Sequence, residues 1–261
     1  MMNALWVSKT GLNAQDHGLS VISNNLANVA TTGFKKDRAV FEDLIYQIQR
    51  QPGALSSQDS RLPSGLQVGT GVKVAGTQKV FTTGGLQETS QPLDLAVNGR
   101  GFFQITMPDG SISYTRDGTF HMDAEGQIVN ASGFLLEPAI TIPDQTNTMT
   151  ISRDGIVSTT LFGETEPTEI GQIEIVDFIN PAGLQAIGGN LFLETASSGA
   201  PQAGVASEAG YGSLEQGFLE NSNVNVVEEM VQMITVQRAY EMNSKVVSSA
   251  DQMLQYLAQN T

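Results

Sequence analysis

Apolar residues recur every seven positions near the N-terminus of this 261-residue chain. The repeat comprises Leu5, Leu12, Leu19 and Leu26, with Ile22 and Val29 on the adjoining turn. Such spacing keeps one seam of a helix facing a partner helix. The pattern predicts a helix of about 30 residues. Asn3 is its expected N-cap, and Gly33 is the expected left-handed residue after its last turn.

The same repeat returns near the C-terminus. It comprises Val226, Met233, Tyr240, Val247 and Leu254, beside Met230, Val236, Ala250 and Leu257. Asn225 is the expected N-cap, and Glu228 lies three residues later, as in a capping box. The pattern predicts a second long helix that ends near Gln259. Two seams so far apart predict a chain whose ends pair with each other or with other chains, although an ordinary core helix against a sheet is the alternative.

Between the two ends the pattern changes to short apolar runs. The candidate strands are Val72–Val74, Leu93–Val97, Phe102–Thr106, Ile128–Val129, Ile140–Ile142, Met149–Ile151, Ile156–Ser158, Gln172–Phe178 and Leu191–Leu193. Turn pairs separate them, at Gly84-Gly85, Asp109-Gly110, Asp117-Gly118, Glu125-Gly126, Asp154-Gly155 and Gly188-Gly189. Short strands with such turns predict antiparallel hairpins.

The predicted fold class is α+β, with long N- and C-terminal helices pairing as a coiled coil and a central, mainly antiparallel β domain. We expect a helical domain from residues 1–34 plus 222–261 and a β-rich domain over 72–221. Residues 35–71 form an expected connecting region. Its part from 50 to 71 is rich in Gly, Ser, Pro and Gln, which predicts extended or irregular backbone there.

Charge is distributed unevenly along the chain. The net charge is −14, yet the stretch from Gly84 to Asn221 alone contains 18 acidic and 3 basic residues. Residues 1–34 carry only Lys9 and Asp16 as charged side chains, and their other polar residues are mostly amides and hydroxyls. Amides tolerate burial better than charges do, so a helix crowded by neighbours is indicated. The acidic balance argues against nucleic acid and anionic membranes as partners.

Cysteine is absent, so disulfides and thiolate chemistry are excluded. Apolar runs stay well short of the ~20 residues that span a bilayer, so membrane insertion is not expected. The N-terminus lacks a basic region followed by an apolar one, so we expect no cleaved secretory signal. Export from the cytosol would then need another route.

Three groups of residues were weighed for chemistry. Gly99-Arg100-Gly101 is a fragment of a dinucleotide fingerprint, but a strand follows it, so a tight turn is favoured. Asp117, His121, Asp123 and Glu125 match neither a calcium nor a zinc pattern, and two hairpin turns are favoured. His17 is interpreted as a packing or capping residue of the first helix. No catalytic or cofactor-binding set emerges, so neither an enzyme activity nor a cofactor is predicted.

Four runs carry a resemblance to a known family. They are SNNLANVATTGFKKDRAVFEDLIYQ (Ser23–Gln47), LDLAVNGRGFFQI, YTRDGTFHMDAEGQIV and SNVNVVEEMVQMITVQRAYEMNSKVVSSADQML (Ser222–Leu254). They resemble the signature segments of bacterial flagellar rod and hook axial proteins, and the resemblance covers essentially the whole chain. The length and the segment Arg50–Val72 most resemble the distal-rod members, because the hook protein has no corresponding insert.

The resemblance implies a structural subunit that assembles into a rigid helical tube. Such a tube is the drive shaft that transmits torque from the motor to the hook, and it leaves a central export channel. The implied partners are further copies of the chain, proximal rod proteins, the hook protein, the P-ring and L-ring bushing and the flagellar type III export apparatus. The implied location is the basal body, in the rod that crosses the periplasm to the outer membrane.

In family terms the paired helices form the inner layer of the tube. The expected subunit-interface residues are therefore Leu5, Leu12, Leu19, Ile22, Asn24, Asn25, Leu26, Asn28, Val29, Val226, Met230, Met233, Tyr240, Val247, Leu254 and Leu257. The expected rigidity segment contains Pro52, Leu55, Leu62, Pro63 and Leu66. We expect residues 1–35 and 222–261 to be largely disordered in the free monomer and to fold on polymerisation.

Two alternatives stay open at this point. One is a related axial component, either the hook or a proximal rod protein. The other is a secreted β-rich binding protein or enzyme with coiled-coil ends.

Overall fold

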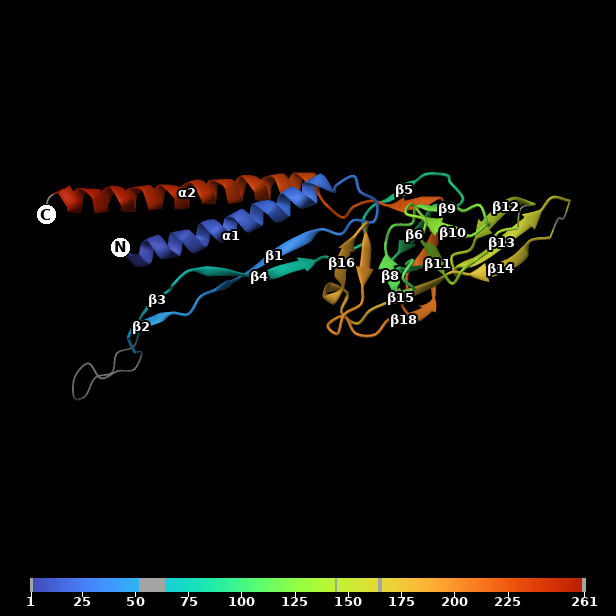
Figure 1. The fold of residues 1–261 in the computed structure, drawn as a ribbon, viewed down its shortest axis with the longest axis horizontal. Coiled ribbons are helices and arrows are strands. Elements are labelled where there is room, and N and C mark those ends of the chain that lie inside the picture. The colour runs from blue at the N-terminus through green and yellow to red at the C-terminus, as the bar shows by residue number, and fades with distance from the viewer. Residues whose placement is uncertain (1, 52–63, 144, 164–165, 260–261) are drawn as a thin grey trace. The chain divides into compact units, whose positions relative to one another are not determined.

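The computed structural model describes residues 2–51, 64–143, 145–163 and 166–259 (Figure 1). The chain forms two compact units. The helical unit comprises Met1–Ala27, Asp37–Gln78 and Asn225–Thr261, and the β unit comprises Asn28–Lys36 and Lys79–Val224. The sequence predicted a separate connecting region over 35–71, whereas the observed division groups Asp37–Gln78 with the helices.

The helical unit is built on two long helices, α1 (Met2–Ala27) and α2 (Val226–Gln259). They lie side by side and run in opposite directions (Figure 1). The start of α2 is as predicted, because the side-chain oxygen of Asn225 accepts the Val227 N–H at 3.1 Å. The predicted end of α2 at Gln259 is also confirmed.

The predicted limits of the first helix are wrong at both ends. Asn3 lies inside α1 and does not cap it, and the helix ends at Ala27, six residues before Gly33. The chain leaves the helix at Asn28, whose backbone and side-chain oxygens accept hydrogen bonds from Thr31. Short polar side chains offer the backbone such alternatives to helix. Gly33 is left-handed as predicted, with φ of +67°, but it lies within the β unit.

Two short ribbons complete the helical unit. Strand β1 (Asp37–Asp43) pairs with β4 (Val72–Lys79), and β2 (Gln47–Arg50) pairs antiparallel with β3 (Leu66–Val68). Strand β3 lies in the stretch where extended or irregular backbone was expected. Most of the predicted rigidity segment, namely Pro52, Leu55, Leu62 and Pro63, lies outside the described residues.

The β unit contains the remaining strands, and their pairings are antiparallel. They are β5 (Leu86–Glu88), β6 (Leu95–Asn98), β7 (Phe103–Thr106), β8 (Ile112–Thr115), β9 (Phe120–Met122), β10 (Ile128–Asn130), β11 (Leu135–Glu137), β12 (Thr146–Ile151), β13 (Ile156–Leu161), β14 (Thr168–Gln172), β15 (Glu174–Asp177), β16 (Gln185–Gly188), β17 (Leu191–Leu193), β18 (Gln202–Val205), β19 (Ser213–Gln216) and β20 (Phe218–Glu220). A short 3-10 helix, η1 (Pro181–Gly183), precedes β16.

The largest sheet has seven strands in the order β16-β17-β8-β7-β11-β10-β9. A second sheet is β12-β13-β14, and the other strands of the β unit form the pairs β15-β18, β19-β6 and β20-β5. The mainly antiparallel β domain predicted from the sequence is therefore confirmed. The candidate strand Ile140–Ile142 is wrong, because this run contributes only an isolated bridge between Gln127 and Thr141.

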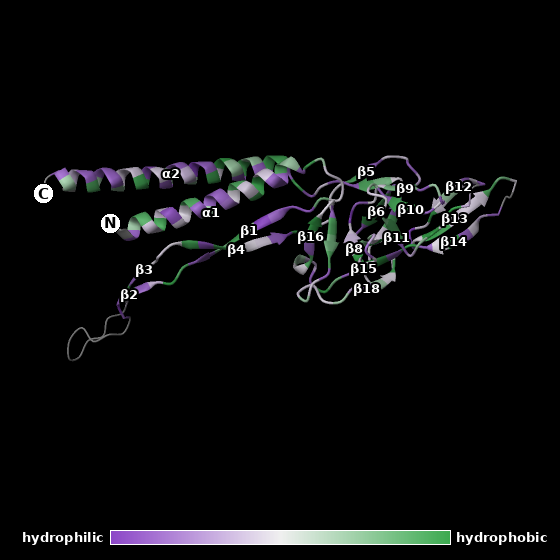
Figure 2. Cartoon of the chain, in the orientation of Figure 1, coloured by the Kyte–Doolittle hydropathy of each residue, from purple (hydrophilic) through white to green (hydrophobic). Residues whose placement is uncertain are grey.

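The β unit has its own apolar core. Hydrophobic residues recur along its strands (Figure 2). One cluster is centred on residues such as Phe103, Ile105 and Leu136, each fully buried. A second cluster is aromatic, and in it Phe81 meets Phe102 and Phe192 edge to face at about 5.3 and 5.4 Å. Edge-to-face contacts of this kind add to the gain from burial. This unit therefore has an apolar core within one chain, although Phe162 and Ile179 at its surface are 73% and 76% exposed.

Replacing Gly33 with alanine should destabilise the β unit more than the same change at Gly110. Both glycines are left-handed, which costs alanine about 1–2 kcal/mol. A Cβ at Gly33 would in addition lie 2.6 Å from the backbone nitrogen of Asp117, whereas a Cβ at Gly110 would meet nothing within 4 Å. Thermal unfolding of the full chain measures the difference. Equal losses from Gly33→Ala and Gly110→Ala would contradict the close approach.

Candidate assembly surfaces

The contact between α1 and α2 follows a line of residues spaced by seven on both helices. Asn25 donates to Glu229 at 3.2 Å, and a Cβ placed on Gly18 would lie 3.9 Å from Val236. One step further, a Cβ on Gly11 would lie 3.0 Å from the side-chain amide of Asn243. Each step moves seven residues back on α1 and seven forward on α2. The two helices therefore keep one antiparallel register along this line.

Glycine determines how closely the helices approach. A Cβ at position 11 would press on the Asn243 side chain, whereas position 18 has room for a Cβ in ordinary contact with Val236 but not for a large side chain. The predicted leucine heptad lies beside this line, and Leu5, Leu12, Leu19 and Leu26 are half-buried in the single chain. The leucine repeat thus located the helix, but on α1 the line of contact runs through Gly11, Gly18 and Asn25, which have low hydropathy.

A buried polar contact lies at one end of the helix pair. Asn25 is 1% exposed, and its side chain both donates to the Asp37 carbonyl at 2.8 Å and accepts the Asp37 N–H at 2.9 Å. Its amide nitrogen also reaches Glu229, which is 2% exposed. Satisfied buried polar groups fix a register, because any shift would leave them unpaired. Asn25, an expected subunit-interface residue, thus makes contacts inside its own chain.

Helix α2 has a second apolar face. Val227, Val231 and Ile234 are 70%, 58% and 49% exposed. Val227 precedes the buried Glu229 by two residues, which is about 200° around a helix, so these residues lie opposite the face that contacts α1. Along the rest of α2 the exposed apolar residues include Met242, Val246, Met253 and Tyr256. A helix that is apolar on two opposite faces needs a partner on each.

The expected interface residues divide by exposure in the single chain. Ile22 and Asn25 are buried, and Leu5, Leu12, Leu19, Leu26, Asn28, Val29, Met233 and Val247 are half-buried. The exposed ones are Asn24, Val226, Met230, Tyr240 and Leu254. The side chain of Leu257 lies outside the described residues. Several predicted residues are thus available to another molecule, and others already have neighbours in the chain.

The ribbons of the helical unit also expose apolar side chains. Ile45 and Ile48 are 86% and 60% exposed, and Tyr46 and Phe41 are close to half exposed. Leu66, from the predicted rigidity segment, is 48% exposed in β3. Two-stranded ribbons are marginal on their own in water. Their apolar side chains form a second surface that a partner could cover.

The three groups weighed for chemistry have structural roles or lie in solvent. Gly99-Arg100-Gly101 connects β6 to β7, as the turn interpretation predicted, and Arg100 pairs with Asp177 at 2.8 Å. Asp117 accepts hydrogen bonds from Thr32 and Thr119, which organise the turn. Over the described ranges, no three His, Cys, Asp or Glu residues gather as metal ligands would. His17 is exposed on α1, so the packing interpretation is wrong in the single chain.

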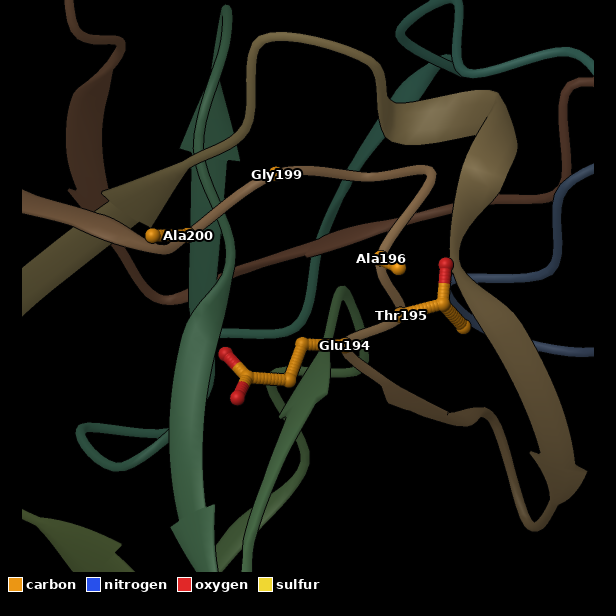
Figure 3. Close-up of a pocket in the computed structure, with 5 residues that line it drawn as sticks. All are labelled: Glu194, Thr195, Ala196, Gly199 and Ala200. Carbon is orange, nitrogen blue, oxygen red and sulfur yellow. The ribbon is translucent and has the colours of Figure 1, made fainter.

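A shallow hollow in the β unit is lined by Glu194, Thr195, Ala196, Gly199 and Ala200 (Figure 3). Its one ionisable group is Glu194, whose side chain is directed away from that of Thr195 (Figure 3). The Thr195 hydroxyl already donates to the Gly183 carbonyl at 2.6 Å. Burial, helped by the charge of Glu194, raises the pKa of Tyr114. A single carboxylate supplies neither an acid–base pair nor an activated nucleophile.

Within the described part of the chain, neither helix combines the length and apolar character of a membrane span.

Both ends and the middle of the chain match known protein families. Residues 5–35 match the family described as flagella basal body rod protein, and residues 215–260 match the flagellar basal body rod FlgEFG protein C-terminal family. Residues 96–159 match the flagellar hook protein FlgE/F/G D1 domain. These matches define a structural protein of the flagellar rod and hook class.

Individual relatives narrow the class. The chain is 54% identical to the flagellar basal-body rod protein FlgG of Buchnera aphidicola subsp. Schizaphis graminum, over 99% of this chain and 100% of the relative. It is 50% identical to FlgG of Borreliella burgdorferi, over 97% of each chain. Identity to the flagellar basal-body rod protein FlgF of Caulobacter vibrioides is 33%, over 95% of this chain and 94% of the relative.

The chain belongs to the flagellar basal-body rod protein FlgG family. It is a structural, non-enzymatic subunit of the distal rod of the flagellar basal body, and it assembles with other rod and hook components. The family named from the sequence is confirmed. The open alternatives of a hook subunit, a proximal rod subunit and a secreted enzyme or binding protein are set aside.

The close approach at Gly18 predicts different effects for two substitutions. Gly18→Ala should polymerise like the parent chain, because a Cβ there makes only ordinary contacts, 3.8 Å from Phe41 and 3.9 Å from Val236. Gly18→Leu should lower the polymer yield, because overpacking costs about 1–3 kcal/mol and separates the helices. Sedimentation of polymer and circular dichroism measure both effects. Normal, fully helical polymer from Gly18→Leu would contradict the proposed line of contact.

Proposed function

We propose that the chain polymerises into a rigid helical tube, which is the drive shaft that carries torque from the motor to the hook and leaves a central export channel. The observation that carries this proposal is the second apolar face of α2. One face of α2 contacts α1, and the opposite face exposes Val227, Val231 and Ile234. Covering that face with a further copy gains roughly 25 cal/mol for each Å² of apolar surface removed from water.

A helical tube is built from heterologous contacts, in which one face of a subunit binds a different face of the next. In the proposed tube the helix pair from residues 1–34 and 222–261, paired as a coiled coil, forms the inner layer. The β-rich domain over 72–221 forms the outer layer, and residues 35–71 connect the two. The charge distribution supports this order, because the acidic side chains are concentrated between Gly84 and Asn221. The first 34 residues, whose only charged side chains are Lys9 and Asp16, are suited to a surface covered by other subunits.

The proposed partners follow from the place of the rod in the basal body. The tube would continue from proximal rod proteins, pass through the P-ring and L-ring bushing and join the hook protein. The rod would cross the periplasm to the outer membrane. Its subunits would reach the growing end through the flagellar type III export apparatus, without a cleaved signal peptide. The absence of cysteine supports export of an unfolded chain, because no disulfide has to be broken or formed on the way.

We propose further that the terminal helices gain their full order only within the polymer. Long isolated helices with exposed apolar faces are marginal, and most of their stability comes from packing. In the dilute chain a cysteine at Val231 should therefore react quickly with an alkylating reagent, and trypsin should cut α2 at Arg238 and Lys245. In the polymer both reactions should slow at least tenfold. The chain has no cysteine of its own, so the single thiol reports one site.

The matched control is a cysteine at Ser132, an exposed turn residue of the β unit. Its alkylation should be similar in dilute chain and in polymer. Equal reactivity of the Val231→Cys thiol in both states would remove the proposed role of the second apolar face. Resistance of both termini to trypsin in the dilute chain would remove the proposed disorder.

The segment Arg50–Gly71 is proposed to lock neighbouring subunits and make the tube straight. Exposed Ile45, Ile48 and Leu66 around β2 and β3 support a contact surface at the described ends of this segment. Deleting Arg50–Gly71 should give a curved or supercoiled polymer in electron micrographs. Replacing the segment with a Gly/Ser chain of equal length is the control, and it should give the same curvature if contacts matter more than length. A straight, rigid polymer from the deleted chain would refute the role.

A further inference from the structure

A buried carboxylate lies at the centre of a polar cluster in the β unit. The side chain of Glu220 is fully buried, and one of its oxygens accepts from the Lys35 ammonium at 2.6 Å and from the Gly84 N–H at 2.8 Å. The other oxygen accepts from the Arg116 guanidinium at 3.4 Å. The backbone carbonyl of Glu220 accepts the Gly33 N–H at 2.7 Å. We call Lys35, Arg116 and Glu220, with the backbone at Gly33 and Gly84, the Glu220 cluster.

The two cations of the cluster also bind backbone carbonyls. Lys35 donates to Thr82 at 2.8 Å, and Arg116 donates to Val97 and Gly99 at 3.1 and 2.6 Å. Burial lowers the pKa of both cations, and the charge of Glu220 opposes that shift in each. One carboxylate therefore serves two buried cations. Removing it would leave both of them in a site of low polarity.

Asn223 extends the cluster toward the start of α2. Its side-chain oxygen accepts the Lys36 N–H at 2.8 Å, and its amide nitrogen donates to the Val80 carbonyl at 2.7 Å. The same nitrogen also reaches the Thr82 hydroxyl at 3.0 Å. Three segments that are far apart in the sequence are thus held together by one side chain.

These segments coincide with the places where the chain passes between its two units. The chain crosses at 27/28, 36/37, 78/79 and 224/225. Within the β unit, Gly33 follows the first crossing, and Lys35 and Lys36 precede the second. Val80, Thr82 and Gly84 follow the third, and Glu220 and Asn223 precede the fourth. Contacts of the cluster therefore tie all four covalent connections to one another, a few residues from each crossing.

We infer that Glu220 is a positioning residue for torque transmission. It clamps the four connections together, so that they bear a load jointly. This inference rests on the proposed function of the rod as a drive shaft. Any load that passes covalently between the units runs through these connections. If the four connections were independent of one another, a twisting load would detach them one at a time. A buried charge cluster resists such detachment, because the loss of any one group would leave another buried group without a partner.

Glu220→Gln tests the clamp in the purified full-length chain by hydrogen exchange. The amides of Gly33 and Lys36 are the informative ones, because the acceptors shown for them are the Glu220 backbone and Asn223, not the carboxylate. We expect exchange at both to rise at least tenfold, together with exchange at Gly84. Exchange at the core amide of Ile105 should not change. A change confined to Gly84, which bonds the carboxylate directly, would overturn the inference.

If the Glu220→Gln chain does not fold, Lys35→Met is the second variant for the same hydrogen-exchange test. It keeps the pair between Glu220 and Arg116 and replaces the ammonium with an apolar end of similar length. The same amides should exchange faster, by a smaller factor. Unchanged exchange at Gly33 and Lys36 in Lys35→Met would count against the clamp in the same way.

The mechanical consequence is measured on motors whose rods contain the variant as the only copy. The matched control is Val157→Ala, which removes volume from the core of the same unit, far from the cluster in sequence. For variants with equal loss of melting temperature, Glu220→Gln rods should turn normally at low viscous load and stall or break at high load. Val157→Ala rods should keep the load dependence of the parent. Equal load dependence of the two variants would overturn the inference.

The two proposals fail separately in this design. If rods of the parent chain carried no torque, the proposed function would fail, and the hydrogen-exchange result would still decide whether Glu220 holds the connections together. If parent rods carry torque and the exchange at Gly33 and Lys36 is unaffected, only the clamp fails.

Discussion

The close contact between α1 and α2 is the constraint on which the helical unit depends. Gly11 lets α2 approach α1 closely, Gly18 faces Val236 one step along, and the buried pair of Asn25 and Glu229 fixes the register at one end. With one face of α2 committed to this contact, the opposite apolar face remains exposed. One face of α2 is thus covered within the chain, and in the proposed polymer neighbouring copies would cover the other.

The two units meet the demands of assembly in different ways. The β unit buries two apolar clusters and a charge cluster within one chain, so it has a complete core (Figure 2). The helical unit exposes apolar residues on α2 and on its ribbons, including Val227 and Ile45. A unit with its own core joined to one with an exposed apolar helix face is suited to a polymer, because the first can be rigid before the second is covered by a partner.

Much of this architecture could be predicted from local pattern. Heptads revealed both helices, the Asn225 cap was correct, and turn pairs divided the middle into antiparallel strands. The end of α1 could not be read, because the heptad continues to Val29 while Asn28 and Thr31 already bond each other in a turn. The line of contact was missed because Gly11 and Gly18 carry no hydropathy signal. The family resemblance supplied the function, which no single side chain reveals.

No local sequence pattern predicts the Glu220 cluster. Nothing near Lys35 in the sequence indicates that its side chain is buried or that its partner is on β20. The aromatic cluster around Phe102 was equally hidden, since Phe81 lies in no strand and joins it only through tertiary packing. The topology of the fold decides which side chains meet across long sequence separations. Hydropathy periodicity indicates only which face of its helix or strand a side chain occupies.

The separation between Lys35 and Glu220 has a consequence for how the protein is made. The pair joins residues 185 positions apart. Contacts so distant along the chain slow folding, because a long loop must be ordered before they form. During synthesis from the N-terminus, Lys35 emerges from the ribosome long before its counterion exists. The Glu220 cluster therefore cannot form until β20 has been made, and under the proposed export route this delay would favour delivery of a chain that is still unfolded.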